Sequence, residues 1–206
     1  MTTELDTTHL LALAAALGWA SGLRLYAVVF LTGLAGWLGW VDLPAGLKLL
    51  QHPALLVASG FMCFVEFFAD KIPGVDTLWD VVHTLLRIPA GAALAAAVFG
   101  ADHASWAAAA ALMGGTLAAT SHLAKTSTRA AVNTSPEPFS NIGLSLLGDA
   151  AVPAALWLSW QHPQLFFVAL MGALVVMAAM IWACAKFLRA LFRRTSAWFG
   201  SEAQHV

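Results

Sequence analysis

The sequence contains little charge. Lys, Arg, Asp and Glu together make up 10% of its 206 residues, whereas about a quarter of the residues of a soluble domain are charged. Hydrophobic residues make up 60%, the mean hydropathy is +0.78, and long apolar runs recur between Leu10 and Arg194. We therefore expect lipid to surround most of the chain. The net charge of -1 and the lack of a basic groove or a base-stacking platform argue against a nucleic-acid partner.

Cysteine is also scarce, and a secretory signal is lacking. The two cysteines, Cys63 and Cys184, both lie inside apolar runs, so we interpret them as small buried hydrophobic residues and expect no disulfide or metal pair. The first residues, MTTELD, are acidic. A secretory signal has a basic region before its apolar core, so we expect the first apolar run to be retained.

Apolar runs separated by Pro, Gly or charged residues predict six membrane spans, each near the ~20 residues that a bilayer requires. They lie roughly at residues 10–40, 52–70, 80–100, 104–123, 139–160 and 164–188. The first is too long for one straight span, and Ser21, Gly22 and Arg24 interrupt it, so we expect a broken helix there. The predicted fold is all-α: a polytopic transmembrane helical bundle in one domain, 1–190, with a basic cytoplasmic tail, 191–206.

The Lys and Arg residues of the loops predict the orientation. With six spans and a cytoplasmic N-terminus, the outside segments contain only Lys48. The inside segments contain Lys71, Lys125, Arg129, Lys186, Arg189, Arg193 and Arg194. Both termini should then be cytoplasmic. The segment 184–199 is typical of a basic amphipathic helix on the inner leaflet, and equally of a stop-transfer charge cluster.

Two segments suggest an internal repeat. GLRLYAVVFLTGLAGWLGW (22–40) and GLSLLGDAAVPAALWLSW (143–160) share GL-x-L and W-L-x-W, and each is followed by QHP, the first after an insertion. An aromatic belt also produces spaced tryptophans, so chance similarity is the alternative interpretation. In the six-span topology the two segments would run in the same direction.

Polar residues at helical spacing occur on both sides of the KIPG turn. Glu66 and Asp70 are four residues apart and share one face of a helix that ends near this turn. After the turn, Asp76, Asp80, His83 and Arg87 follow at spacings of four, three and four. They predict a polar stripe, which we call the acidic stripe, on the start of the third span.

Two further stripes lie later in the chain. His122, Lys125, Arg129 and Asn133 recur at three and four residues and form a basic stripe, whereas Asn141, Ser145 and Asp149 recur every four residues on the fifth span. We expect the acidic and basic stripes to face each other around a crevice open to the cytoplasm, into which Arg24, Arg87 and Asp149 project. The alternatives are ordinary interfacial charges and a structural ion pair between Arg87 and Asp149. The candidate ion- or substrate-binding residues are Glu66, Asp70, Asp76, Asp80, His83, Arg87, His122, Lys125, Arg129, Asn141, Ser145 and Asp149.

Two of these segments carry a family resemblance. FFADKIPGVDTLWDVVHTLLRIPAGA (67–92) together with SHLAKTSTRAAVNTSPEPFSN (121–141) resembles the domain-of-unknown-function family 4126 of bacterial integral membrane proteins, over roughly residues 10–190. The resemblance implies a multi-pass protein of a bacterial inner membrane. It implies no activity and no active-site residues.

The intramembrane charges and the broken helix favour a small transporter or channel-like carrier for an ion or small solute. In this hypothesis Glu66, Asp70, Asp80 and Asp149 bind a cation or proton, and nearby cations neutralise them or hold an anionic group. We expect the protein to need no cofactor. Its expected partners are the bilayer, the ion or solute and a second copy of the chain, because six short spans enclose little volume.

Two other classes of function remain open. One is a membrane-embedded enzyme or binding protein that acts on a phosphorylated lipid head group at the inner leaflet, with Mg²⁺ held by Asp76 and Asp80. Against it, the chain has no G-x-S-x-G nucleophile motif and no metal motif with ligand spacing. The other is a scaffold subunit whose ion pairs only hold the bundle together.

Overall fold

The computed structural model describes residues 6–72, 74–134 and 139–202, without the side chains of 192 and 194–202. Over these ranges the chain is helical and contains no strand, which confirms the all-α prediction. The elements are α1 (Thr7–Trp37), η1 (Ala45–Gln51), α2 (Pro53–Ala69), α3 (Val75–Phe99), η2 (Ala101–His103), α4 (Ala104–Val132), α5 (Phe139–Gln161) and α6 (Pro163–Glu202). Helix α6 continues through the predicted domain boundary near residue 190, and Arg194 of the predicted tail lies outside the described side chains.

Helix α1 lies at the centre of the bundle. It packs against α2, α3, α4, α5 and α6, and its first half buries an almost continuous run from Ala12 to Leu25. Arg24 has φ −148° and ψ 87°, which is not helical, so the helix breaks there. The predicted break is confirmed. A break in buried backbone requires other groups to satisfy the freed carbonyls.

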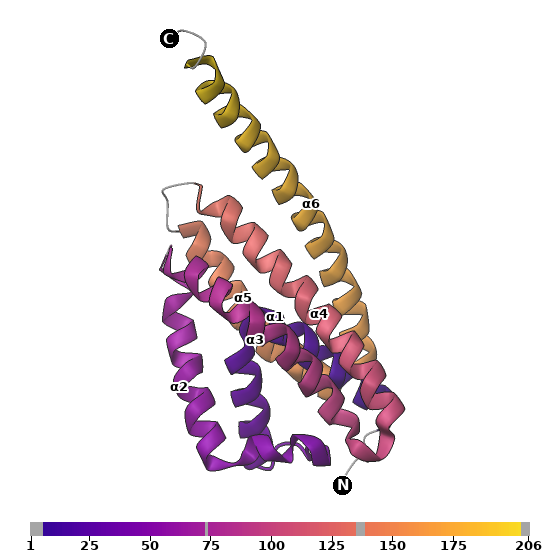
Figure 1. Cartoon of the computed structure of the whole chain (residues 1–206). Helices are drawn as coiled ribbons and strands as arrows, with labels where there is room; N and C mark the ends of the chain where they lie inside the picture. Colours follow the sequence, from indigo (N-terminus) through magenta and orange to yellow (C-terminus); the bar gives the residue numbers. More distant parts are fainter. Residues whose placement is uncertain (1–5, 73, 135–138, 203–206) are drawn as a thin grey trace.

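The two halves of α1 return to the same end of the bundle. A Cβ on Gly18 would overlap Gly114, and one on Gly22 would overlap Ala118, four residues further along α4, so the first half runs parallel to α4. In the second half, Phe30 packs at Gly60 and Gly33 packs at Leu56, so this half runs antiparallel to α2. Because α2 and α4 point the same way, α1 ascends, turns at Arg24 and descends (Figure 1).

This course bears on the number of spans, which the apolar runs placed at about six. Over the described residues, α2 to α6 each run along the bundle, whereas α1 turns back at Arg24 (Figure 1). By length and hydropathy alone, α1, α3, α5 and α6 qualify as spans, and η1 with α2 qualifies as a bent pair at 71°. The Ala-, Ser- and Thr-rich α4 does not qualify, although it is 29 residues long. Helix α4 nevertheless packs along α1 and α3, whereas α1 doubles back.

The described chain consequently begins and ends at opposite ends of the bundle. Helix α1 starts at the lower end in Figure 1, and α6 finishes at the upper end. The expectation that both termini share one side assumed that the first apolar run crosses the membrane. In the structure α1 instead turns back at Arg24, so both of its ends lie at the same end of the bundle.

The suggested repeat has a structural counterpart. The second half of α1 and α5 both descend in Figure 1, and the helices that follow them, α2 and α6, both ascend. Each ascending helix starts directly after a histidine, at Pro53 and at Pro163, where proline suits the first helical position. This arrangement favours a parallel repeat over chance similarity.

Small residues allow α1, α3 and α4 to approach closely. Gly18 of α1, Gly91 of α3 and Gly114 of α4 lie against one another, and a Cβ on any of them would collide with the neighbouring helix. Ala95 and Ala118 are fully buried in the same contact. The alanine- and glycine-rich runs of α3 and α4 therefore provide the close helix packing. It brings the polar stripes of α3 and α4 within contact distance of the break in α1.

Candidate functional site

Ten charged side chains form one connected network inside the upper half of the bundle. Five are cations and five are carboxylates, joined by ten ion pairs of 2.6 to 3.8 Å. They are Arg24, Lys71, Arg87, Lys125 and Arg129 with Glu66, Asp70, Asp76, Asp80 and Asp149. The network is formally neutral, and no side chain in it is more than 22% exposed. We call it the charge network.

The acidic stripe of α3 faces the interior as predicted. Asp76, Asp80, His83 and Arg87 are buried, whereas the neighbours Leu78, Val81 and Leu85 are exposed on the opposite face. Arg87 is fully buried. Its Nη2 donates to Glu66 at 2.8 Å, and its Nη1 donates to Asp80 at 2.6 Å.

The basic stripe of α4 meets the acidic stripe, which confirms the predicted juxtaposition. Arg129 Nη1 lies 2.6 Å from Asp80 and 3.0 Å from Asp70. Lys125 Nζ contacts the same two carboxylates at 3.2 and 2.9 Å. Asn133 lies 3.4 Å from Asp76, at the upper end of both stripes. Both Asp70 and Asp80 are thus shared among several cations.

The break in α1 opens directly onto this network. Arg24 lies 2.9 Å from Asp149 and 3.3 Å from Asp70, and it donates to Ser145 Oγ at 2.8 Å. Lys125 Nζ donates to the carbonyl of Leu23 at 2.9 Å. The helix break therefore supplies the charge network with a cation, Arg24, and a backbone carbonyl, that of Leu23. Buried carbonyls need a hydrogen-bond donor, and the Lys125 side chain provides it here.

The stripe of α5 divides into two parts. Asp149 pairs with Lys71 at 2.9 Å and with Arg24, and Ser145 lies between the same two cations. The alternative of an Arg87–Asp149 ion pair is wrong, because each of these groups is paired with other partners. Asn141, 1% exposed, makes no side-chain hydrogen bond within the described part of the chain. Unsatisfied buried amides are uncommon and call for an explanation such as a bound water or ligand.

The two histidines of the stripes are held by hydrogen-bonding groups. His83 Nδ1 lies 2.8 Å from the carbonyl oxygen of Trp79, and its Nε2 lies 3.1 Å from the hydroxyl of Tyr26. His122 lies 2.8 Å from Thr84 Oγ1 and 3.3 Å from Arg87 Nη1. Both rings border the network without an ion pair, so they extend it as polar groups.

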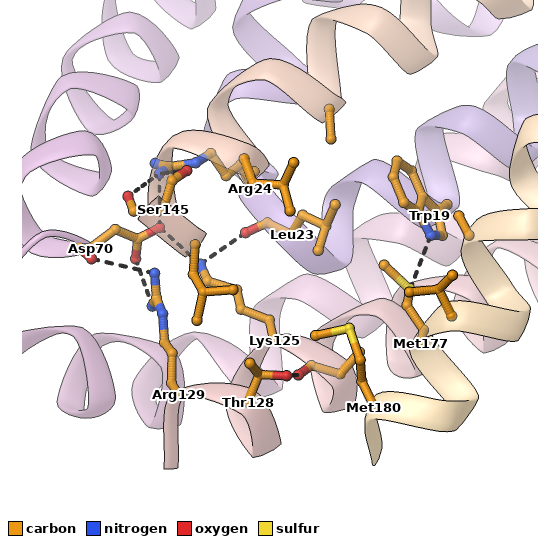
Figure 2. Close-up of a pocket in the computed structure, with 17 residues that line it drawn as sticks. Trp19, Leu23, Arg24, Asp70, Lys125, Thr128, Arg129, Ser145, Met177 and Met180 are labelled. Carbon is orange, nitrogen blue, oxygen red and sulfur yellow. Dashed lines mark hydrogen bonds and ion pairs between the residues drawn. The ribbon is translucent and has the colours of Figure 1, made fainter. Parts of the chain in front are cut away.

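A cavity of about 260 Å³ adjoins the network between α1, α4, α5 and α6 (Figure 2). Its polar end is formed by Arg24, Asp70, Lys125, Arg129 and Ser145. The rest of its wall is apolar, with Trp19, Met177 and Met180 on the side of α6. Of the three residues expected to project into a crevice, Arg24 lines this cavity, whereas Arg87 and Asp149 do not.

Three functional groups were missing from the candidate residues. Arg24 was recognised as an intramembrane charge, which is itself a signal of a site, but its partners were not apparent. Lys71 was counted as a loop cation, yet it reaches Asp149 across 78 residues of sequence. Tyr26, the only tyrosine in the chain, contacts His83, and nothing in its sequence context pointed to this role.

The carboxylates of the site face cations. Asp76 and Asp80, suggested as Mg²⁺ ligands, both contact Arg129. Within residues 6–72, 74–134 and 139–202, no group of three or more His, Cys, Asp or Glu side chains has an arrangement that could hold a metal ion. The hypothesis of a metal-dependent lipid enzyme gains no supporting geometry from these residues.

Comparison with known proteins identifies a family and no individual relative. No curated protein and no solved structure matches the chain. The family model described as a domain of unknown function, number 4126, matches residues 11–186, which include every charge of the network. The chain therefore belongs to the domain-of-unknown-function family 4126.

Proposed function

We propose that the protein is a small membrane carrier for an ion or small solute, with the charge network and its adjoining cavity as the binding site. The observation that carries the proposal is the sharing of carboxylates. Asp70 contacts Arg24, Lys125 and Arg129, and Asp80 contacts Arg87, Lys125 and Arg129. Because each of these carboxylates contacts three cations, it can lose one of them and remain paired. A charged solute can therefore take the place of one partner without leaving a buried charge unpaired.

Stability alone is a poor reason for this network. Each buried ion costs several kcal/mol to remove from water, and apolar residues of similar size often replace a buried pair with no loss of stability. Asp70 and Arg87 have no measurable exposure. Ionisable groups at such depth typically mark a pathway or binding site, so a purely structural scaffold leaves their presence unexplained.

The broken helix supports the same function. In secondary transporters, discontinuous helices end near the bilayer midplane and present free backbone groups and helix ends to the substrate. In this protein α1 breaks at Arg24, and the carbonyl of Leu23 is coordinated by Lys125. A bound cation can replace Lys125 at this carbonyl, and movement of Lys125 would leave the carbonyl open to such a cation.

The distribution of cations supports a cytoplasmic position for the upper end of Figure 1. Lys71 follows the upper end of α2, and Lys186 and Arg189 lie in the second half of α6, whereas Lys48 lies in η1 at the other end. By the positive-inside rule the upper end is cytoplasmic. The proposed location is a bacterial inner membrane, with α1 entering and leaving from the opposite side.

The test is ion movement by the full-length chain in proteoliposomes. We expect currents on a solid-supported membrane after concentration jumps of at least one of H⁺, Na⁺, K⁺, phosphate and a membrane-soluble carboxylate such as oleate. Asp149→Asn should reduce the current about tenfold or more, because it removes the partner of both Arg24 and Lys71. Asp102→Asn, an exposed residue of η2 at the other end, is the control. Absence of current for every probe, or an unchanged current in Asp149→Asn, would overturn the proposal.

A further inference from the structure

The cavity has two chemically different parts. Its polar end is formed by three cations, Arg24, Lys125 and Arg129, and by Asp70; outside the cavity lining, the same cations also pair with Asp149 and Asp80. Its remaining wall consists of apolar side chains of α5 and α6, among them Leu144 and Val176. A hydrated inorganic ion gains nothing from such an apolar wall, and a plain hydrocarbon leaves the cationic end unused. The lining therefore suits a molecule with an anionic head and an apolar chain.

Two guanidinium groups beside the cavity have incomplete hydrogen bonding. Within the described part of the chain, Arg24 Nη1 makes no hydrogen bond, although Nε and Nη2 of the same side chain are engaged by Asp149, Asp70 and Ser145. Arg129 Nη2 makes only a long contact of 3.4 Å with the carbonyl of Asp70. Guanidinium groups are the preferred partners of carboxylate and phosphate oxygens. An anionic head can thus bind without first breaking every existing pair.

The apolar part of the cavity reaches the outer surface between α5 and α6. Leu147 of α5 and Val176 of α6 both line it, and their side chains are 65% and 56% exposed. In a membrane protein such residues face hydrocarbon. A chain that starts in the cavity can therefore continue into the bilayer beside these residues, so the ligand need not fit inside the protein.

The volume favours a slender ligand. At about 260 Å³, the cavity is below the ~300–1,000 Å³ range of pockets that enclose a drug-sized molecule. It has room for one head group and the first carbons of one chain, and no room for the glycerol backbone and paired chains of a full phospholipid.

We propose that this cavity binds a single-chain anionic amphiphile, with its carboxylate or phosphate head at Arg24 and Arg129 and its chain leaving between α5 and α6. This inference rests on the proposed carrier function, since it names the class of solute for the same site. A fatty acid and a lysophosphatidate share the required chemistry, and the experiment distinguishes between them.

A glycine of α5 permits a clean test. A Cβ on Gly148 would point into the cavity, where its nearest neighbour is Arg24 Nε at 3.7 Å. Gly148→Leu should therefore fill cavity space beside Arg24 without striking backbone. Gly143 lies on the same helix, and a Cβ there has no neighbour within 4 Å. Gly143→Leu is thus the matched control, with the same change in helix propensity and in side-chain size.

The experiment measures equilibrium binding to the full-length chain in a non-ionic detergent by native mass spectrometry. The probes are oleate, oleoyl lysophosphatidate and oleylamine, which share one chain and differ in the head. We expect one oleate or one lysophosphatidate per chain and about tenfold weaker binding of the cationic oleylamine. Gly148→Leu should weaken anion binding about tenfold, while Gly143→Leu should leave it unchanged. Binding of lysophosphatidate alone identifies a phosphate head, and binding of oleate as well identifies a carboxylate head as sufficient.

Equal binding of oleylamine, or unchanged binding in Gly148→Leu, would overturn the inference. Because the assay uses no gradient, it is independent of transport. If currents carried by Na⁺ or H⁺ persist in Gly148→Leu while no amphiphile binds, the inference fails and the carrier function stands. If the amphiphile binds but no probe moves across the membrane, the carrier function fails and the binding site stands.

Discussion

Replacing Arg87 with Met should destabilise the protein strongly, and the structure gives the magnitude. Arg87 is fully buried and is the ion-pair partner of both Glu66 and Asp80. Asp80 retains Lys125 and Arg129 after the change. Glu66, which is also buried, has no other ion-pair partner among the described residues, and its Oε2 is already without a hydrogen bond. Removing one member of a buried pair costs about 3–5 kcal/mol because the other charge stays unpaired.

The assay is thermal unfolding of the purified chain in detergent, followed by near-UV circular dichroism. For a chain of this length, a loss of about 3–5 kcal/mol corresponds to a fall in Tm of about 6–20 °C. Arg189→Met, an exposed position on α6, is the matched control and should leave the Tm nearly unchanged. Adding Glu66→Met to Arg87→Met removes the orphaned charge and should recover most of the loss. A single variant as stable as the control, or a double variant no better than the single one, would refute this account of the network.

Two further predictions concern the architecture. Gly22→Leu should lower the free energy of unfolding by about 1–3 kcal/mol, because a Cβ there would overlap Ser121 and the backbone of Ala118, whereas Gly143→Leu should not; equal stability of the two variants in the same unfolding assay would contradict the packing of α1 on α4. In a background without Cys63 and Cys184, cysteines placed at Thr8 and Trp40 should react with an impermeant maleimide from one side of sealed vesicles, and a cysteine at Phe139 from the other. Labelling of Thr8 and Trp40 from opposite sides would show that α1 crosses the membrane.

Much of the candidate site could be predicted from spacing alone. Helical periodicity placed Asp76, Asp80 and Arg87 on one face, and burial of that face follows because the rest of the helix is apolar and suits lipid. The same rule placed Lys125 and Arg129 together on α4, and the expectation that opposite charges meet was correct. These predictions succeed because a charged side chain within a span avoids lipid, faces the interior of the bundle and pairs with an opposite charge there.

Partner choice could not be predicted in the same way. Arg87 and Asp149 were both expected to project into one crevice, yet the first pairs with Glu66 and the second with Lys71. Pairing depends on the rotation and lateral position of each helix, which close contacts such as Gly18 against Gly114 determine. The spacing of polar residues along one helix contains no information on how that helix is rotated or placed relative to its neighbours.

By itself, the sequence indicated a membrane protein and determined the helical content, the polar faces and the position of the break at Arg24, because all of these follow from local composition and spacing. Only the tertiary structure decided where the chain goes after that break. A run of 31 residues is long enough to cross a bilayer or to enter and return. The choice depends on packing: the first half of α1 fits between the small residues of α4, the second half descends along α2, and the turn between them carries Arg24 into the charge network.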